Sequence, residues 1–73
     1  MAEPSVVVYT HPDCDYSTAL KSDLDRDGIA YREIDISVVP GAIEELMRLA
    51  DGERTTPVMV EDGRVTVGYH GVG

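Results

Sequence analysis

Apolar residues change their spacing several times along this chain, and each spacing predicts one kind of secondary structure. Residues 5–10 form a continuous β-branched and aromatic run, which is typical of a strand covered on both faces and therefore central in its sheet. Residues 30–36 alternate weakly between apolar and polar and predict a second strand. Residues 58–60 and 65–67 flank an Asp-Gly turn pair, and together they predict a terminal β-hairpin.

Helical spacing occurs twice between these strands. The first helix is predicted from Asp15 to Asp27, and Gly28 follows it as a left-handed C-terminal stop. Its apolar positions are Tyr16, Ala19, Leu20 and Leu24. Its last turns also contain aspartates that oppose the helix dipole, and the local sequence gives no reason for them. These residues are Asp23, Asp25 and Asp27.

A second helix is predicted to begin at Pro40 and to stop near Gly52. Its apolar stripe consists of Ile43, Leu46, Met47 and Ala50. The predicted order is therefore β-α-β-α-β-β. The first β-α-β unit requires a parallel pair with a right-handed crossover, and the last two strands run antiparallel. An α/β fold with a mixed four-stranded sheet follows.

Length and composition limit the classes of function. The 73 residues suffice for one small domain, residues 1–73, because chains near this size bury only about 60% of their unfolded surface. The net charge of −8 disfavours nucleic acid and anionic membrane surfaces as partners. We find no signal peptide and no run near the roughly 20 apolar residues of a membrane span. A single cysteine suits a reducing compartment, so we expect a cytoplasmic protein.

That cysteine, Cys14, lies in the segment 10–17 between the first predicted strand and the first predicted helix. A helix begins with unpaired N–H groups and a partial positive charge, which stabilise a thiolate, the form that attacks disulfides. Asp13 and Asp15 flank the cysteine and act against the thiolate. We expect a thiol that is mildly more acidic than free cysteine. The alternative is a small apolar residue packed at the helix start.

The element order and two motifs resemble a known family. Cys14-Asp15-Tyr16-Ser17 follows the first strand and Thr55-Thr56-Pro57 precedes the third, as in a glutaredoxin of the thioredoxin superfamily. The short length and the ending in residues 67–71 resemble, more narrowly, the small UXX-star glutaredoxin-like proteins, some of which carry selenocysteine at the position of Cys14. The resemblance implies a thioredoxin-like, glutaredoxin-type fold whose C-terminal helix is missing or vestigial here.

The resemblance makes Cys14 the nucleophile of a monothiol thiol-disulfide oxidoreductase. Ser17 stands where other members place a resolving cysteine, so a mixed disulfide on Cys14 would need glutathione or another low-molecular-weight thiol as co-substrate. The partner would be a disulfide-bearing protein or a small-thiol mixed disulfide. No tightly bound cofactor and no metal are expected. Physically, a serine in a helix's first turn most often makes a local hydrogen bond.

Further site residues are implied in the same way. Pro57 corresponds to a cis-proline, Thr56 would offer backbone groups to a thiol ligand, and Tyr16 would shield the sulfur. From residue type alone, a proline commonly begins a strand, and an aromatic on an apolar stripe is as often core.

Two regions of the chain depart from the family pattern. His11 stands where glutaredoxins commonly carry a lysine, and an imidazole is cationic only part of the time near neutrality. Gly68, Tyr69 and His70 stand where two glycines and an acidic residue usually hold the amino end of glutathione. The acid is absent, so these three residues are candidates for binding a different thiol.

Two other functions stay open at the level of sequence. Monothiol glutaredoxins also carry iron-sulfur clusters between two chains, although such proteins typically have glycine and phenylalanine where Asp15 and Tyr16 stand. A module that senses oxidation through Cys14 without turnover is the other alternative. Without a last helix, one sheet face would be covered by the first helix alone. We expect apolar surface there, which would favour a homodimer.

Overall fold

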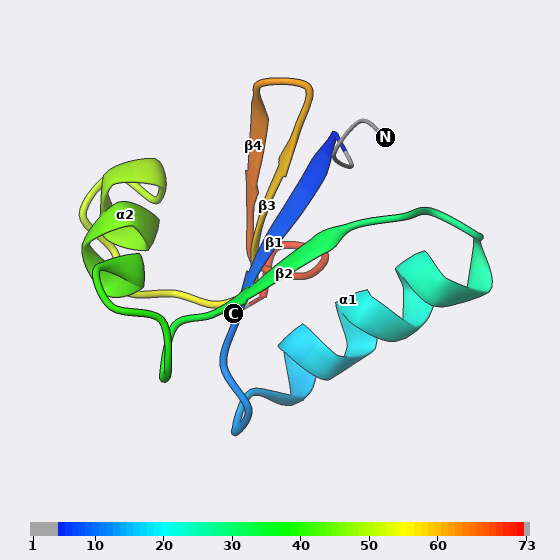
Figure 1. Ribbon diagram of the computed structural model, residues 1–73, viewed down its shortest axis with the longest axis horizontal. Helices are drawn as coiled ribbons and strands as arrows, with labels where there is room; N and C mark the ends of the chain where they lie inside the picture. Colours follow the sequence, from blue (N-terminus) through cyan, green and yellow to red (C-terminus); the bar gives the residue numbers. More distant parts are fainter. Residues whose placement is uncertain (1–4, 73) are drawn as a thin grey trace.

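The computed structural model describes residues 5–72 and shows the predicted order of elements (Figure 1). The elements are β1 (Val6–Thr10), α1 (Asp15–Arg26), β2 (Arg32–Asp35), α2 (Ala42–Leu49), β3 (Val58–Glu61) and β4 (Arg64–Val67). The strand order in the sheet is β2-β1-β3-β4, with β1 parallel to β2 and antiparallel to β3. The predicted mixed sheet and the interior position of β1 are confirmed.

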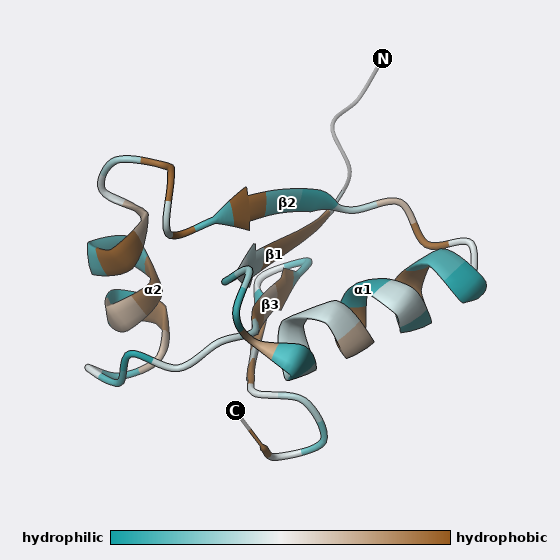
Figure 2. Ribbon diagram, turned by 90° about the horizontal axis from the view of Figure 1, so that it is seen from below, coloured by the Kyte–Doolittle hydropathy of each residue, from teal (hydrophilic) through white to brown (hydrophobic). Residues whose placement is uncertain are grey.

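The two helices lie on opposite faces of the sheet (Figure 1). Because side chains alternate along β1, Val6 and Val8 pack with Leu24 of α1, whereas Val7 and Tyr9 belong to the core beneath α2. The buried members of the α2 core are Tyr9, Ile36, Ala42, Leu46, Ala50 and Val58. Hydrophobic colouring runs along both central strands in Figure 2. Burying each large aliphatic side chain contributes roughly 1.5–3 kcal/mol.

Both helices differ from prediction in detail. Helix α2 begins at Ala42 rather than Pro40, because Gly41 adopts a left-handed conformation (φ 80°) that a helix cannot contain. In α1, Tyr16 was placed on the apolar stripe, but its side chain is 42% exposed. Leu24 is buried and Leu20 packs beside it, so the stripe lies further along the helix.

The aspartates at the end of α1 have partners that the local sequence does not reveal. The partners are Tyr69 for Asp23, Tyr31 for Asp25 and Arg26 for Asp27. Each hydrogen bond offsets part of the unfavourable interaction with the helix dipole. Gly28 (φ 70°) ends the helix as predicted.

The half of the α1 face that lies on β3 and β4 is mainly polar. Met59 pairs with Val8 and with Thr66, and paired residues share a face. The side chains on this half of the face are Met59, Glu61, Arg64 and Thr66. Our expectation of exposed apolar surface beside α1 is therefore wrong, since the exposed valines of β4, Val65 and Val67, lie on the other face.

No helix within residues 5–72 has the length and apolar character needed to cross a membrane. The described residues that follow β4 form a turn instead of a helix.

Candidate functional site

Cys14 is the N-cap residue of α1, so its side chain begins beside the free N–H groups of the first turn. Its backbone is extended (φ −105°, ψ 111°), and its N–H donates to the carbonyl oxygen of His11 at 3.1 Å. The side chain is half-buried and forms no disulfide. The thiol therefore lies at the positive end of the helix dipole and keeps contact with solvent.

The Thr56-Pro57 edge meets this thiol. The peptide bond between the two residues is cis, as the resemblance implied, and Pro57 is buried immediately before β3. The Cys14 thiol donates to the Thr56 carbonyl oxygen, with 3.5 Å between sulfur and oxygen. The fold thus joins two predicted halves of the site that are 42 positions apart in the sequence.

Several groups act on the pKa of Cys14. Burial raises this pKa, because desolvation disfavours the thiolate. Hydrogen bonding by the side chains of Thr56 and Ser17, and by the backbone N–H groups of Ser17 and Tyr16, lowers it and outweighs burial. The pKa of the thiol is therefore lowered from its ordinary value, the direction that the sequence predicted. A larger fraction of the sulfur is thiolate near neutral pH as a result.

Ser17 and His11 fix the turn before α1. Ser17 is 1% exposed, and its Oγ accepts a hydrogen bond from the backbone N–H of His11 at 3.3 Å. The Nδ1 atom of His11 accepts one from the N–H of Asp13 at 3.1 Å. Ser17 thus makes the local hydrogen bond expected in a first turn, and one ring nitrogen of His11 is used within the turn itself.

Three residues close to Cys14 in the sequence have exposed side chains. Asp13 and Asp15 are exposed, and within residues 5–72 neither carboxylate has an ion-pair partner. Tyr16 is exposed too, which rules out a core role and leaves its ring open to a ligand beside Cys14. The open side of the site therefore carries two negative charges and one aromatic ring.

The predicted residues after β4 make different contacts. Gly68 lies against the site, because its N–H donates to the Pro57 carbonyl oxygen at 2.7 Å. The hydroxyl of Tyr69 instead donates to Oδ2 of Asp23 at 2.5 Å. His70 is exposed, and its ring meets the Tyr69 ring edge-on at 4.3 Å between centroids. The contact between Tyr69 and Asp23 was not predicted from the sequence. Its one indication there is the unfavourable position of Asp23 near the C-terminal end of the helix.

A polar network under α1 was also missed. The buried hydroxyl of Thr10 donates to Oε2 of Glu33 at 2.7 Å, and Nζ of Lys21 donates to the same oxygen at 3.0 Å. The hydrogen bond from Thr10 lowers the pKa of Glu33, which burial opposes and Lys21 reinforces. The sequence did contain an indication of this network. Polar and apolar residues alternate along β2, and Glu33 pairs with Val8, so its side chain lies on the same face of the sheet as Val8, beneath α1.

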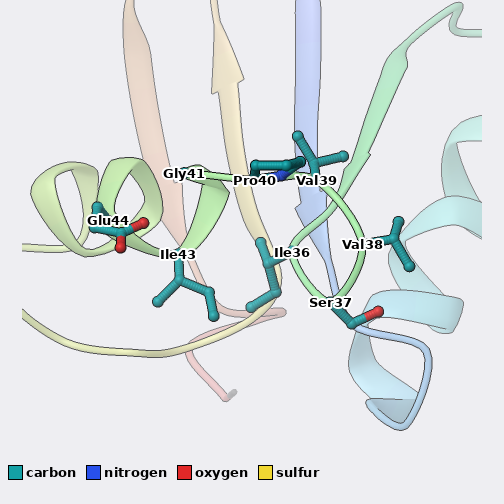
Figure 3. A pocket seen from close by; sticks show the side chains of 8 residues that line it. All are labelled: Ile36, Ser37, Val38, Val39, Pro40, Gly41, Ile43 and Glu44. Carbon is teal, nitrogen blue, oxygen red and sulfur yellow. The ribbon is translucent and has the colours of Figure 1, made fainter.

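Two hollows flank the turn between β2 and α2. One has a volume of about 360 Å³ and is lined by residues 36–41 with Ile43 and Glu44 (Figure 3). The other, of about 390 Å³, lies beside Tyr9 and Glu45, whose side chains are hydrogen-bonded to each other. Neither hollow includes Cys14 or the Thr56-Pro57 edge. Among residues 5–72 there is also no cluster of three His, Cys, Asp or Glu side chains suited to a metal ion.

Comparison with known proteins identifies the family. The glutaredoxin family model matches residues 6–66, which include both Cys14 and Pro57. No curated protein matches the chain.

Solved structures agree with this match. The thioredoxin-like protein BC3987 is 34% identical, covers 88% of this chain and 86% of its own, and gives a TM-score of 0.78. Glutaredoxin from Brucella melitensis is 29% identical over 93% of this chain and 73% of its own, with a TM-score of 0.73. The buckwheat glutaredoxin–glutathione complex is 25% identical over 89% and 61%, with a TM-score of 0.74. The chain therefore belongs to the glutaredoxin family and is a redox protein of that type with a single cysteine.

Proposed function

We propose that this protein is a monothiol glutaredoxin-like thiol-disulfide oxidoreductase with the Cys14 sulfur as its nucleophile. The observation that carries the proposal is the half-buried Cys14 thiol, at the N-cap of α1 and 3.5 Å from the Thr56 carbonyl oxygen. Its lowered pKa supplies thiolate near neutral pH, and the thiolate is the attacking species.

The reaction proceeds by two exchanges. The Cys14 thiolate attacks one sulfur of the substrate disulfide, that S–S bond breaks, and the other sulfur leaves as a thiolate that takes a proton from water. A mixed disulfide remains on Cys14. Because the chain has no second cysteine, an external thiolate attacks this mixed disulfide and regenerates the Cys14 thiolate. The external thiol ends in a disulfide with the group it removes.

Glutathione is the proposed external thiol, with another low-molecular-weight thiol as the alternative. A buckwheat relative with 25% identity has been solved as a complex with glutathione. In this chain the Thr56 backbone would hold the cysteine part of the bound thiol, while the exposed Tyr16 ring would lie along it. Gly68 supports this edge through its hydrogen bond to Pro57.

We also propose that the protein works in the cytoplasm, where a free thiol stays reduced. The homodimer and the UXX-star subgroup stay predictions. Size-exclusion chromatography with mass measurement at high protein concentration tests the first.

Replacing Cys14 by serine tests the catalytic proposal. We expect turnover of a mixed-disulfide substrate, coupled to glutathione oxidation, to fall to the uncatalysed rate. Mass spectrometry of the native chain should show one added glutathione per molecule after exposure to oxidised glutathione. The Cys14→Ser variant should show none.

A matched variant separates the site from a thiol in general. Cys14→Ser combined with Ser22→Cys moves the only thiol to an exposed position further along α1. We expect this variant to form the adduct slowly and to restore no turnover. Full turnover in either variant would overturn the proposal.

A further inference from the structure

The segment that follows β4 closes into a tight turn. The N–H of Tyr69 donates to the Val72 carbonyl oxygen at 2.5 Å, and the N–H of Val72 donates back to Tyr69 at 3.0 Å. The residues between them, His70 (φ 51°) and Gly71 (φ 82°), are both left-handed, as in a two-residue type I′ turn. The turn is closed by its own backbone, so it holds Tyr69 in a fixed orientation.

Two tethers connect this turn to the rest of the protein. Gly68 donates its N–H to Pro57, and only glycine fits there, because an added Cβ would lie 2.9 Å from the Val72 carbonyl oxygen. The hydroxyl of Tyr69 reaches Asp23 in the last turn of α1, 46 positions away in the sequence. The turn therefore links the proline edge of the site to the helix that presents the nucleophile.

Direct packing holds α1 through few side chains. Ser17 and Leu24 are the buried residues of α1, Leu20 packs beside Leu24, and Tyr16 is exposed. The hydrogen bond from Tyr69 to Asp23 adds a polar tether at the Leu24 end of the helix, and this tether comes from the Pro57 side of the site. Because the helix is a rigid element, a shift at that end moves Cys14 at the other end relative to Thr56.

We propose that Tyr69 is a positioning residue, whose hydrogen bond to Asp23 seats α1 so that the Cys14 sulfur stays beside the Thr56 carbonyl oxygen. The proposal rests on the proposed role of Cys14 as nucleophile. In this proposal Tyr69 acts on the reaction through Asp23 and α1. The edge-on ring of His70 supports the Tyr69 ring in this orientation.

The test compares two tyrosines that both bond to α1. Tyr31 hydrogen-bonds to Asp25 at the far end of the helix, so Tyr31→Phe removes a similar contact without touching the turn after β4. The pH dependence of Cys14 alkylation by iodoacetamide gives the thiol pKa in each variant. If the sulfur moves away from Thr56, it loses the hydrogen bond from the Thr56 side chain, which is the largest influence lowering the pKa of the Cys14 thiol. We therefore expect Tyr69→Phe to raise this pKa by about half a unit, which lowers the thiolate fraction below the pKa about threefold. Tyr31→Phe should keep the pKa of the native protein.

Variants of Asp23 provide the rescue. Asp23→Asn keeps an oxygen that accepts from the Tyr69 hydroxyl and should preserve the thiol pKa, whereas Asp23→Ala should reproduce Tyr69→Phe. Thermal unfolding, measured in parallel, shows whether all variants are folded. An unchanged pKa in Tyr69→Phe, or equal shifts in Tyr69→Phe and Tyr31→Phe, would overturn the positioning role.

Alkylation needs no turnover, so the two proposals fail separately. If Tyr69→Phe raises the thiol pKa as expected but the native protein catalyses no exchange, the proposed function is wrong, and the effect of Tyr69 on the position of the thiol holds. If the native protein turns over normally and Tyr69→Phe leaves the thiol unchanged, only the positioning role is wrong.

Discussion

The two faces of the sheet are built from different chemistry. Beneath α2 the buried residues are almost all apolar and centre on Leu46 and Val58, both fully buried. Beneath α1 the apolar cluster is smaller, and the buried polar residues Thr10 and Ser17 lie beside it. The α2 face therefore supplies most of the hydrophobic stabilisation. The α1 face instead buries two hydroxyl groups that form hydrogen bonds, that of Thr10 with Glu33 and that of Ser17 with the turn before α1.

The largest change that we expect in the free energy of unfolding comes from replacing one buried leucine by alanine on each face of the sheet. Leu46→Ala should lower the free energy of unfolding by about 2–5 kcal/mol, because the fully buried side chain leaves a cavity in the larger cluster. Leu24→Ala on the α1 face should cost less, since fewer buried residues surround it. Urea unfolding measures both. If Leu24→Ala costs as much as Leu46→Ala, the contrast between the faces is wrong.

Alkaline pH probes the α2 face through the hydroxyl of Tyr9, which belongs to the core beneath α2. Burial, and then the hydrogen bond and charge of Glu45, raise the pKa of Tyr9 from 10.0 to about 12. The unfolded chain loses the proton near pH 10 while the folded protein keeps it. Stability from this group is therefore complete below pH 10 and is lost as the pH rises toward 12.

Replacing Tyr9 by phenylalanine should remove this loss, which is on the order of 2 kcal/mol. Unfolding curves between pH 8 and about 11.5 measure it, since the difference between the native chain and Tyr9→Phe should shrink as the pH rises. The pKa values of Tyr31 and Tyr69 are raised as well, so the native slope contains their contributions and only the difference is diagnostic. A difference that does not change with pH would contradict the assignment.

The smallest effect concerns the open side of the α1 face. Changing Asp13 and Asp15 to asparagine removes two exposed negative charges beside Cys14, so the thiol pKa should fall further, by about half a unit. Stability should hardly change, because both side chains are exposed.

The control for this pair changes Glu61 to glutamine and Asp62 to asparagine. It alters the net charge equally, but at the end of the hairpin remote from Thr56. Alkylation against pH should distinguish the two double variants. If they shift the thiol pKa equally, net charge rather than the neighbours of Cys14 controls the site.

The sequence contained the order of elements and the place of the thiol, because both follow from local patterns. The central strand, the hairpin and the cysteine at a helix start each depend on residues close together in the chain. The cis bond at Pro57 came only through the resemblance to glutaredoxins. The left-handed Gly41 that shortens α2 was not anticipated, although Gly-after-Pro is a turn signal.

Side-chain partners across the fold could not be predicted. Asp23 reaches Tyr69 over 46 positions and Thr10 reaches Glu33 over 23, and no local propensity encodes such pairs. The sequence alone shows that the acids at the end of α1 are unfavourable for the helix. Such a local conflict is expected where a contact elsewhere in the fold compensates for it. A local conflict of this kind thus marks where to look for a distant partner.

The hydrogen bond from the Cys14 thiol to the Thr56 carbonyl oxygen has a consequence for binding. When the sulfur ionises, it has no proton left to donate, and a half-buried carbonyl loses its partner. In the proposed reaction, a disulfide substrate would bring an electrophilic sulfur together with a neighbouring backbone amide that can donate to this carbonyl. Deprotonation of Cys14 would then both create the nucleophile and free the Thr56 carbonyl oxygen for the substrate, which would couple binding of the substrate to ionisation of the thiol.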